Sequence, residues 1–434
     1  MFSPMNWIAR IDNVVYNTIH YQVHVTFDNM EVQMRRAHTV QVNDSRIPLR
    51  HEVRPFFQPI LSLQTQEIIG YETLGRRIGG DHVESLGPFF KNPDIPEDVQ
   101  LLIDRHLREL AIEQLASTHD QSSLFINLKP SWIYRTYKRT GVLPTIELLR
   151  KYDINPARIV IEITEEEFTG KLHELTQIVE LYREFGCTIA IDDVGSGFSN
   201  FDRIASLQPK ILKIDLNILK KSAIHAGYKA LMQSFSILAA QMGASLLVEG
   251  VETKQELHSA LQVGARYVQG YLFSKAEPYL QYKDAFKPLL KEEMNLFGQG
   301  EFQRNSHLSA IHRNLDALTQ SASRIVSAED ADRLIEHTIN TVTGNCIRIY
   351  ICMEDGSQIS SNYIRKNDAW NKDESYRGAN WTWRPYFISN ILMMNLQKQG
   401  TLSQVYTDLD TSHQIQTYSC ALGDGYYLFL DLMI

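Results

Sequence analysis

For the central part of this 434-residue chain, the sequence predicts an α/β fold, an irregular (β/α)8 or TIM-like barrel. Short runs rich in β-branched residues recur between residues 55 and 280, and stretches with helical periodicity separate most of them. This alternation is typical of βα units around a parallel sheet. The runs are apolar on both faces, as strands buried between helices and a barrel core must be.

The eight predicted strands begin with a pair separated only by residues 64–67. Because this gap is too short for a crossover helix, we expect an antiparallel hairpin, which makes the start of the barrel irregular. In chain order the predicted strands are 56–63, 68–74, 123–128, 159–163, 188–192, 211–214, 245–249 and 266–270. The predicted helices are 98–117, 131–150, 172–185, 225–242 and 253–263.

The sequence divides into four parts around this barrel. Residues 1–50 alternate apolar and polar side chains, which predicts an N-terminal extension with a small β-ribbon. Residues 51–282 form the barrel, and 283–342 form a helical connector in which Ser327 is a helix N-cap. Residues 343–434 form a compact antiparallel α+β domain, similar to PAS/Cache-like sensor modules. Its predicted strands are 346–353, 403–409, 414–420 and 426–432.

Composition excludes several classes of protein. Hydrophobic residues make up 44% and charged residues 22%, as in ordinary globular proteins. The formal net charge is −8 and no basic run stands out, so we expect no nucleic-acid polymer as partner. No stretch approaches the ~18–20 apolar residues of a membrane span, so we expect no membrane insertion.

The four cysteines are few and lie outside zinc-binding spacings, which favours reduced thiols in a cytoplasmic protein. Cys346 and Cys352 have even spacing on one predicted strand, so we expect them to share a face as inert apolar side chains.

Polar residues gather where the predicted barrel strands end. They comprise several carboxylates together with one asparagine, one lysine and one glutamine. Because the carboxyl ends of parallel strands open on one face of a barrel, we expect these side chains to share a cavity. They are Glu72, Asn127, Glu162, Asp192, Asp193, Lys213, Asp215, Glu249 and Gln269. Any one of these acids alone would more often be a helix cap or a solvated loop residue.

Several carboxylates in one cavity repel one another unless they are protonated or neutralised by cations. The donors are all oxygen, with no cysteine or histidine at the strand ends, which favours Mg²⁺ or Mn²⁺ over Zn²⁺. The adjacent Asp192 and Asp193 suit two ions about 3.5–4 Å apart, one of the carboxylates bridging them. Two such ions beside Lys213 fit phosphodiester hydrolysis.

The same residues carry a resemblance to a known family. Tyr71-Glu72-Thr73-Leu74 followed by Arg76 resembles the signature of the EAL-domain cyclic di-GMP phosphodiesterases. Six further motifs follow in the family's order: Asn127, Glu162–Glu165, Asp192–Gly197, Lys213–Asp215, Glu249–Glu252 and Gln269–Tyr271. The resemblance covers about half of the chain. The connector and the C-terminal domain, with Trp381, Trp383, Arg384 and Tyr386, are similar to the YkuI-type branch of this family.

The resemblance implies a role for each residue. Glu72, Asn127, Glu162 and Asp192 would hold the first ion, and Asp192 would bridge to a second ion held by Asp193 and Glu249. Glu72, Lys213 and Glu249 would be catalytic, with Lys213 orienting or deprotonating the attacking water. Replacing Lys213 with alanine is therefore expected to slow turnover and to leave metal binding nearly unchanged.

The resemblance also implies the substrate and its contacts. The substrate would be cyclic di-GMP and the product linear pGpG. Arg76 would contact phosphate, Gln58 the nucleotide, and Gln269 would lie at the rim of the cavity. Glu165 would steady the loop after Asp193. Asp215 and Glu252 would position Lys213 and the metal ligands.

Four substitutions depart from the family pattern: Thr73 replaces the alanine of the signature, Val194 and Ser196 replace the usual phenylalanine and threonine, and Lys129 replaces the usual serine. Gly79-Gly80-Asp81 is interpreted as a turn.

Two alternatives to a phosphodiesterase stay open at this point. A non-catalytic cyclic di-GMP receptor would bind without forming product, and a barrel glycosidase would survive chelation of metal. The C-terminal aromatic residues form either a core or a small-ligand pocket, and the connecting helices are a candidate homodimer contact.

Overall fold

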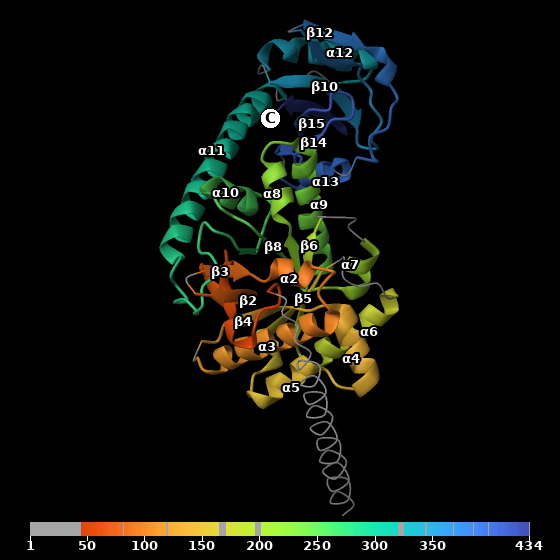
Figure 1. The fold of residues 1–434 in the computed structure, drawn as a ribbon. Coiled ribbons are helices and arrows are strands. Elements are labelled where there is room, and N and C mark those ends of the chain that lie inside the picture. The colour runs from red at the N-terminus through yellow and green to blue at the C-terminus, as the bar shows by residue number, and fades with distance from the viewer. Residues whose placement is uncertain are drawn as a thin grey trace, which may run out of the picture. The chain divides into compact units, whose positions relative to one another are not determined.

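The computed structural model describes residues 45–433 except 81, 119, 165–170, 196–200, 320–324, 343–344, 368, 385 and 398, and no side chains of residues 216, 226, 304–319, 341 and 397. The predicted β-ribbon of residues 1–50 lies almost wholly outside the described residues. The chain divides into two compact units, Met1–Met294 and Asn295–Ile434, which we call the barrel unit and the C-terminal unit (Figure 1).

The barrel unit contains the predicted closed sheet. Its strand order is β1-β9-β8-β7-β6-β5-β4-β2-β3, and a pairing of β1 with β2 closes the ring. β1 is antiparallel to both β2 and β9, whereas the strands from β2 through β4 to β9 pair in parallel. The predicted irregular barrel and its opening hairpin are therefore confirmed. The strands are β1 (Val53–Ser62), β2 (Glu67–Gly79), β3 (His82–Ser85), β4 (Ser123–Asn127), β5 (Ile159–Thr164), β6 (Thr188–Val194), β7 (Ile211–Ile214), β8 (Ser245–Val248) and β9 (Tyr267–Val268).

One strand of this sheet was not predicted. β2 extends to Gly79, and β3 folds back on it with Gly79 opposite His82. Gly80 has a φ of +58°, a conformation that glycine adopts without steric strain, so this segment is a turn as expected. The strand after it went unpredicted because all four residues of β3 are exposed and show no apolar period.

Helices cover the outside of the barrel (Figure 1). The predicted helix 131–150 is two helices, because Gly141 ends the first with a φ of +68° and Pro144 starts the second. The helices of the unit are α2 (Gly87–Lys91), α3 (Glu97–Ala116), α4 (Pro130–Thr140), α5 (Pro144–Lys151), α6 (Leu172–Glu184), α7 (Phe201–Leu207), α8 (Leu216–Ser222), α9 (Ala226–Met242) and α10 (Lys254–Gln262).

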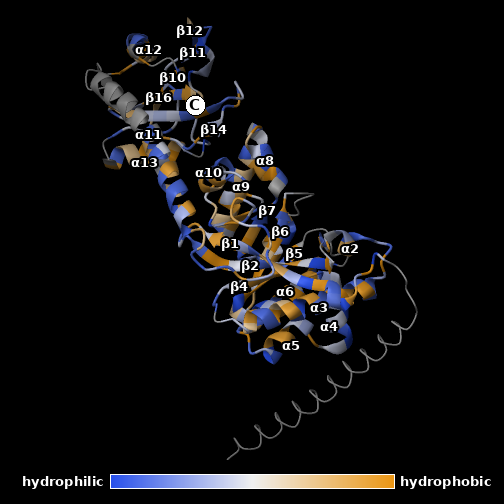
Figure 2. Cartoon of the chain, turned by 60° about the vertical axis from the view of Figure 1, so that its left-hand side comes forward, coloured by the Kyte–Doolittle hydropathy of each residue, from blue (hydrophilic) through white to orange (hydrophobic). Residues whose placement is uncertain are grey.

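The core of the barrel unit follows from this arrangement. One large buried cluster lies between strands and helices, and it includes Leu124, Ile161, Ile189 and Leu212. Figure 2 shows orange apolar segments alternating with blue hydrophilic ones along the helices around the sheet. A second, smaller cluster lies inside the ring of strands. Apolar burial on both faces explains why the strands could be predicted from apolar runs.

The C-terminal unit is an antiparallel α+β domain, as predicted. The order of its strands is β12-β11-β10-β16-β15-β13, and β14 pairs with β15. The strands are β10 (Cys346–Met353), β11 (Asn362–Lys366), β12 (Ala369–Asp373), β13 (Thr401–Leu402), β14 (Tyr406–Thr407), β15 (Gln414–Gly423) and β16 (Tyr426–Met433). The helices of the connecting region and this unit are α11 (Lys287–Thr319), α12 (Ala328–Thr338) and α13 (Phe387–Gln397).

Several details of this unit differ from the prediction. β11, β12 and α13 were not predicted, and the strand expected over 403–409 is replaced by the two short strands β13 and β14. The predicted N-cap is present, since the Ser327 side chain accepts a hydrogen bond from the Asp330 amide.

Cys346 and Cys352 do not share a strand face. The register of β10 against β16 shifts between Cys346 and Arg348, and one extra residue moves every later side chain to the opposite face. Cys346 consequently packs with Ile349 and Ile351, whereas Cys352 packs in a separate cluster with Tyr350.

The aromatic residues after β12 are divided between core and surface. Trp381 packs against a buried cluster and stacks on Trp383, but the Trp383 side chain is exposed. The Arg384 guanidinium lies over both rings.

None of the described helices is both long enough and apolar enough to cross a membrane.

Candidate metal centre

A layer of polar side chains lies directly above the apolar layer inside the barrel. Phe125, Val160, Ala190, Ile211 and Leu247 belong to the buried cluster within the ring of strands. Side chains two residues apart on a strand point to the same face, so the next inward positions toward the carboxyl ends are fixed by these residues. Those positions are Asn127, Glu162, Asp192, Lys213 and Glu249. The period of the strands therefore places five of the predicted site residues inside one mouth of the barrel.

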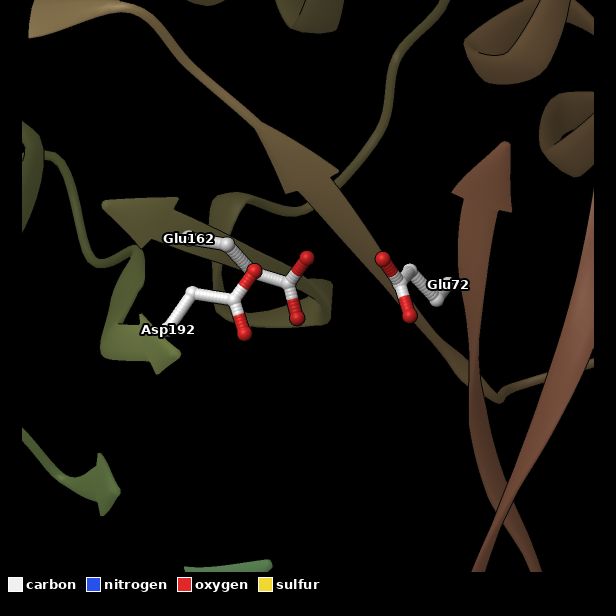
Figure 3. Close-up of side chains that lie close together, drawn as sticks. All are labelled: Glu72, Glu162 and Asp192. Carbon is white, nitrogen blue, oxygen red and sulfur yellow. The ribbon is translucent and has the colours of Figure 1, made fainter. Parts of the chain in front are cut away.

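Glu72 joins this layer from β2. Its carboxylate and those of Glu162 on β5 and Asp192 on β6 offer oxygen atoms that all lie within 4.8 Å of one another. Figure 3 shows the three carboxylates turned toward one another across the mouth. Glu162 is completely buried, and Glu72 and Asp192 are each 8% exposed. These three residues form a compact site for one cation.

A second group of three carboxylates shares Asp192 with the first. Asp192, Asp193 and Glu249 also offer oxygen atoms within 4.8 Å of one another. Neighbouring residues on a strand normally point to opposite faces, but Asp193 has a φ of +55° and the β6–β7 register shifts between Ile191 and Val194. This local break turns two consecutive carboxylates toward the same mouth. We call Glu72, Glu162, Asp192, Asp193 and Glu249 the acidic cluster.

The ammonium of Lys213 lies at the centre of this cluster. Its Nζ is 2.7 Å from Glu162, 2.8 Å from Glu249, 3.0 Å from Asp192 and 3.7 Å from Glu72. The side chain is fully buried on β7. Sequence reasoning placed a lysine in this cavity but did not predict that one ammonium would contact four carboxylates.

Burial and crowding shift the pKa values of the cluster. Burial raises the pKa of Glu162 and of Glu249 well above that of a free glutamic acid, although Lys213 opposes the shift. Burial and the neighbouring Asp192 raise the pKa of Asp193 to about 6. For Asp192 burial acts upward, but the Lys213 ammonium together with hydrogen bonds to Glu249 and the Asp193 amide outweighs burial, and the pKa is lowered. Burial thus favours the neutral form of Glu162 and Glu249, and a bound cation would favour their ionised form.

The residues present fit divalent cations that prefer oxygen ligands. Apart from the ion pair with Lys213, neither oxygen of Glu162 has a hydrogen-bond partner among the described residues. One oxygen of Glu249 likewise has no hydrogen-bond partner among the described residues apart from its ion pair with Lys213. Five ionised carboxylates facing one ammonium leave four negative charges, which two divalent cations would balance.

Three amide side chains complete the floor of the site. Asn127 donates a hydrogen bond to Glu72 at 3.1 Å, and Gln269 donates to the other Glu72 oxygen at 2.7 Å. Gln269 also donates to Gln58. Gln269 is only 3% exposed, so its expected place at the rim is wrong: it lies inside, where it orients Glu72.

Two residues that support Gln58 were missed from the sequence. Gln58 donates to the Ser274 carbonyl, and Gln281 donates to the Ser274 hydroxyl. Both partners lie in the irregular segment after β9, where no periodic pattern reveals which way a side chain points.

Arg76 lies further along β2, near the mouth. Its guanidinium stacks over the Phe56 ring and donates to the Gly75 carbonyl, and burial lowers its pKa. None of its hydrogen-bonding partners among the described residues is an acid of the cluster. Thr73, which replaces the signature alanine, has a buried hydroxyl without a hydrogen-bond partner in the described chain.

The three acids predicted to support the site lie in different surroundings. Asp215 caps α8 by accepting a hydrogen bond from the Asn217 amide. Glu252 forms an exposed ion pair with Lys220 at 2.9 Å and does not contact Lys213. Glu165 and the loop from Ser196 to Asn200 lie outside the described residues.

Comparisons with known proteins agree on one family. Residues 42–276 match the EAL domain, and residues 280–434 match an EAL-domain associated signalling protein domain. The EAL-domain containing protein YkuI of Bacillus subtilis (strain 168) is 34% identical over 389 residues, which is 88% of this chain and 94% of that protein. The cyclic di-GMP phosphodiesterase RocR of Pseudomonas aeruginosa is 27% identical over 240 residues, 54% of this chain and 59% of RocR.

A solved structure resembles most of the chain. It is the crystal structure of Bacillus subtilis YkuI in complex with substrate c-di-GMP and calcium. The TM-score is 0.79 at 32% sequence identity, and the match covers 89% of this chain and 97% of that chain. The likeness thus includes both units.

Proposed function

This chain belongs to the EAL-domain family, and on that premise we propose that it is a metal-dependent phosphodiesterase that hydrolyses cyclic di-GMP to linear pGpG. The observation that carries the proposal is the acidic cluster with Lys213 at its centre. Without cations, five carboxylates would repel the phosphates of a dianionic nucleotide, so the cluster supports a site that holds metal.

The proposed ligands are the residues whose oxygen atoms gather at the mouth. Glu72, Asn127, Glu162 and Asp192 would hold one cation, and Asp192, Asp193 and Glu249 would hold a second. We propose Mg²⁺ or Mn²⁺ for both. When bound, such cations lower the pKa of water and offset the negative charge of a phosphodiester in its transition state.

The chain's own residues would bind and orient the substrate. Arg76 has a planar guanidinium suited to a phosphate and no carboxylate partner in the described chain to compete for it. Gln58 would contact the nucleotide from its place beside Gln269. Lys213, as an ammonium, would orient the attacking water by donating a hydrogen bond to it. Glu72 and Glu249 would be the catalytic carboxylates; they lie 3.7 Å and 2.8 Å from the Lys213 ammonium.

The direct test is product formation. The purified full chain, incubated with cyclic di-GMP and Mg²⁺ or Mn²⁺, is expected to yield pGpG, which chromatography separates from the substrate. Asp192→Ala should abolish turnover, whereas Asp98→Ala on the exposed start of α3 should retain it. Tight binding of cyclic di-GMP without product would identify a receptor instead. Activity that survives EDTA would exclude the proposed metal dependence.

Several further properties are proposed from the sequence and its resemblance to the family. A homodimer, a cytoplasmic location and a PAS/Cache-like sensor role for the C-terminal unit follow from that resemblance and from the sparse cysteines. The C-terminal unit would then regulate hydrolysis in the barrel unit. Its test is whether a small molecule that binds this unit, once identified, changes the rate of pGpG formation.

A further inference from the structure

We propose that Lys213 and the first divalent cation compete for the same place in the acidic cluster, so that metal can bind only by displacing the Lys213 ammonium. The inference rests on the metal dependence proposed above and deepens it. Lys213 would then serve as the internal counter-charge of the metal-free protein and move to its position beside the substrate only when the site is loaded.

The geometry of the cluster carries this inference. Nζ of Lys213 lies within 3.0 Å of oxygen atoms of both Glu162 and Asp192, two of the three residues that form the first cation site. The third, Glu72, is 3.7 Å away. Cations such as Mg²⁺ and Ca²⁺ approach carboxylate oxygens to about 2.0–2.6 Å. An ion bound by these three carboxylates therefore enters the space that the ammonium fills.

Charge reinforces the steric conflict. The Lys213 side chain is completely buried, so water cannot screen its charge from an arriving cation. An ammonium and a divalent ion that share the same carboxylate oxygens repel each other strongly. The lysine side chain has a flexible four-carbon stem, and it can move as the cation enters without a change in the backbone of β7.

The displaced ammonium has a place to go within the same mouth. Nζ already lies 2.8 Å from Glu249, which belongs to the second group of carboxylates and not to the first. Two divalent cations and one ammonium together balance the five carboxylates of the acidic cluster. The lysine is thus expected to stay in the loaded site, shifted away from Glu162 and Asp192.

The inference reverses the expectation drawn from the sequence, in which removing Lys213 leaves metal binding unchanged. In Lys213→Met the cation meets no competing ammonium, and the metal-free state holds carboxylates without their counter-charge. Both effects strengthen metal binding, so we expect Mn²⁺ to bind Lys213→Met at least tenfold more tightly than it binds the wild type.

The experiment is isothermal titration of the metal-stripped full chain with Mn²⁺, without nucleotide. The matched control is Lys151→Met, which removes a lysine paired with Glu109 on the outer surface of the barrel unit and should leave the affinity unchanged. An affinity of Lys213→Met equal to or weaker than that of the wild type overturns the inference. If the wild type binds no Mn²⁺, the proposed function itself fails.

A second measurement does not require the variant to fold. A crystal structure of the wild type with Mn²⁺ is expected to show Nζ of Lys213 displaced from Glu162 and Asp192. An ammonium still within ion-pair distance of both carboxylates, beside a cation bound to the same residues, contradicts the competition.

Discussion

Asp193 combines an unusual backbone conformation with a place in the acidic cluster. Its φ of +55° lies in the left-handed region, which aspartate and asparagine tolerate better than other residues with a side chain. The same conformation brings its carboxylate to the group that contains Asp192 and Glu249. One residue therefore determines both the local chain direction and the second cation site.

Asp193→Asn should reduce the number of bound Mn²⁺ ions from two to one. Asparagine keeps the tolerance for positive φ but loses the charge, while the group of Glu72, Glu162 and Asp192 remains. Electron paramagnetic resonance of Mn²⁺ titrated into the full chain counts the bound ions. Two ions in the variant would show that the second ion does not need the charge of Asp193.

Asp332 offers a test of pH dependence far from the acidic cluster. The side chain is 2% exposed and accepts hydrogen bonds from the amide and hydroxyl of Ser361 and from Arg377, and it pairs with Lys372. Burial acts to raise its pKa, but Lys372, Arg377 and Ser361 outweigh burial and hold the pKa below its usual value of 3.8. The ionised carboxylate therefore stabilises the C-terminal unit.

Asp332→Asn is expected to lower the free energy of unfolding of that unit by about 1.5–3 kcal/mol at neutral pH, the range for hydrogen bonds to a charged group. Because the pKa is lowered in the folded state, the stabilisation is complete above about pH 4 and is lost as the pH falls further. Urea unfolding of wild type and variant at pH 7 and about pH 3 measures the difference at each pH. A difference that persists undiminished at the lower pH contradicts the assignment.

At the residue scale, the sequence predicts which side chains enter the mouth better than it predicts their partners. Glu162, Asp192 and Glu249 could be placed because each follows an apolar inward residue by two positions. The burial of Gln269 could not be predicted, because it depends on an amide contact with Glu72 across the barrel. The faces of Cys346 and Cys352 were wrong because an extra residue in a strand leaves no mark in the apolar period.

At the scale of elements, the barrel mouth depends on a close approach between two chain segments. A β-carbon on Gly270 would lie 2.1 Å from the carbonyl oxygen of Val251 and 2.3 Å from its amide nitrogen. The Val251 amide donates to the Gln269 carbonyl, so this contact joins the segments after β8 and β9. Only glycine permits that distance between the two backbones.

Gly270→Ala should destabilise the barrel unit by more than the ~1–3 kcal/mol typical of overpacking, because backbone rather than a side chain must move. Gly79→Ala, at a position where an added β-carbon would meet no other atom within 4 Å, should stay within about 0.5 kcal/mol of the wild type. Thermal unfolding compares the three proteins. Equal melting temperatures for both variants would show that the two segments can move apart without destabilising the barrel unit.

Elements differ in how well the sequence predicts them. Buried strands such as β7 have apolar runs that end at their true bounds. β12 is exposed or half-buried along its whole length and has no such run. The break between α4 and α5 was missed although Gly141 and Pro144 mark it, because the apolar period continues on both sides.

For the molecule as a whole, all proposed ligands of the cations lie in the barrel unit. A ligand that binds only the folded state stabilises it by about 2.7 kcal/mol at a hundredfold excess over its Kd. Chains with two compact units often unfold in separate transitions. Calorimetry with and without Mn²⁺ is therefore expected to show a higher transition temperature for the barrel unit alone. Equal shifts of both transitions would place cation binding outside the acidic cluster.

The division into an EAL domain and a smaller α+β domain could be predicted because each part has its own strand pattern. The number of chains in the assembly and the signal that the C-terminal unit senses depend on exposed surfaces. The periodicity of apolar residues does not predict such surfaces, so both stay predictions.

The four cysteines offer a way to follow this protein's motions. All are buried thiols outside any disulfide, Cys187 in the barrel unit and Cys346, Cys352 and Cys420 in the C-terminal unit. Burial raises the pKa of Cys187 to about 12, so the native thiol is unreactive. A thiol-specific dye can then label each cysteine only during transient opening of its surroundings. Peptide mapping of the labelled sites over time would give separate opening rates for the two units without any substitution in the sequence.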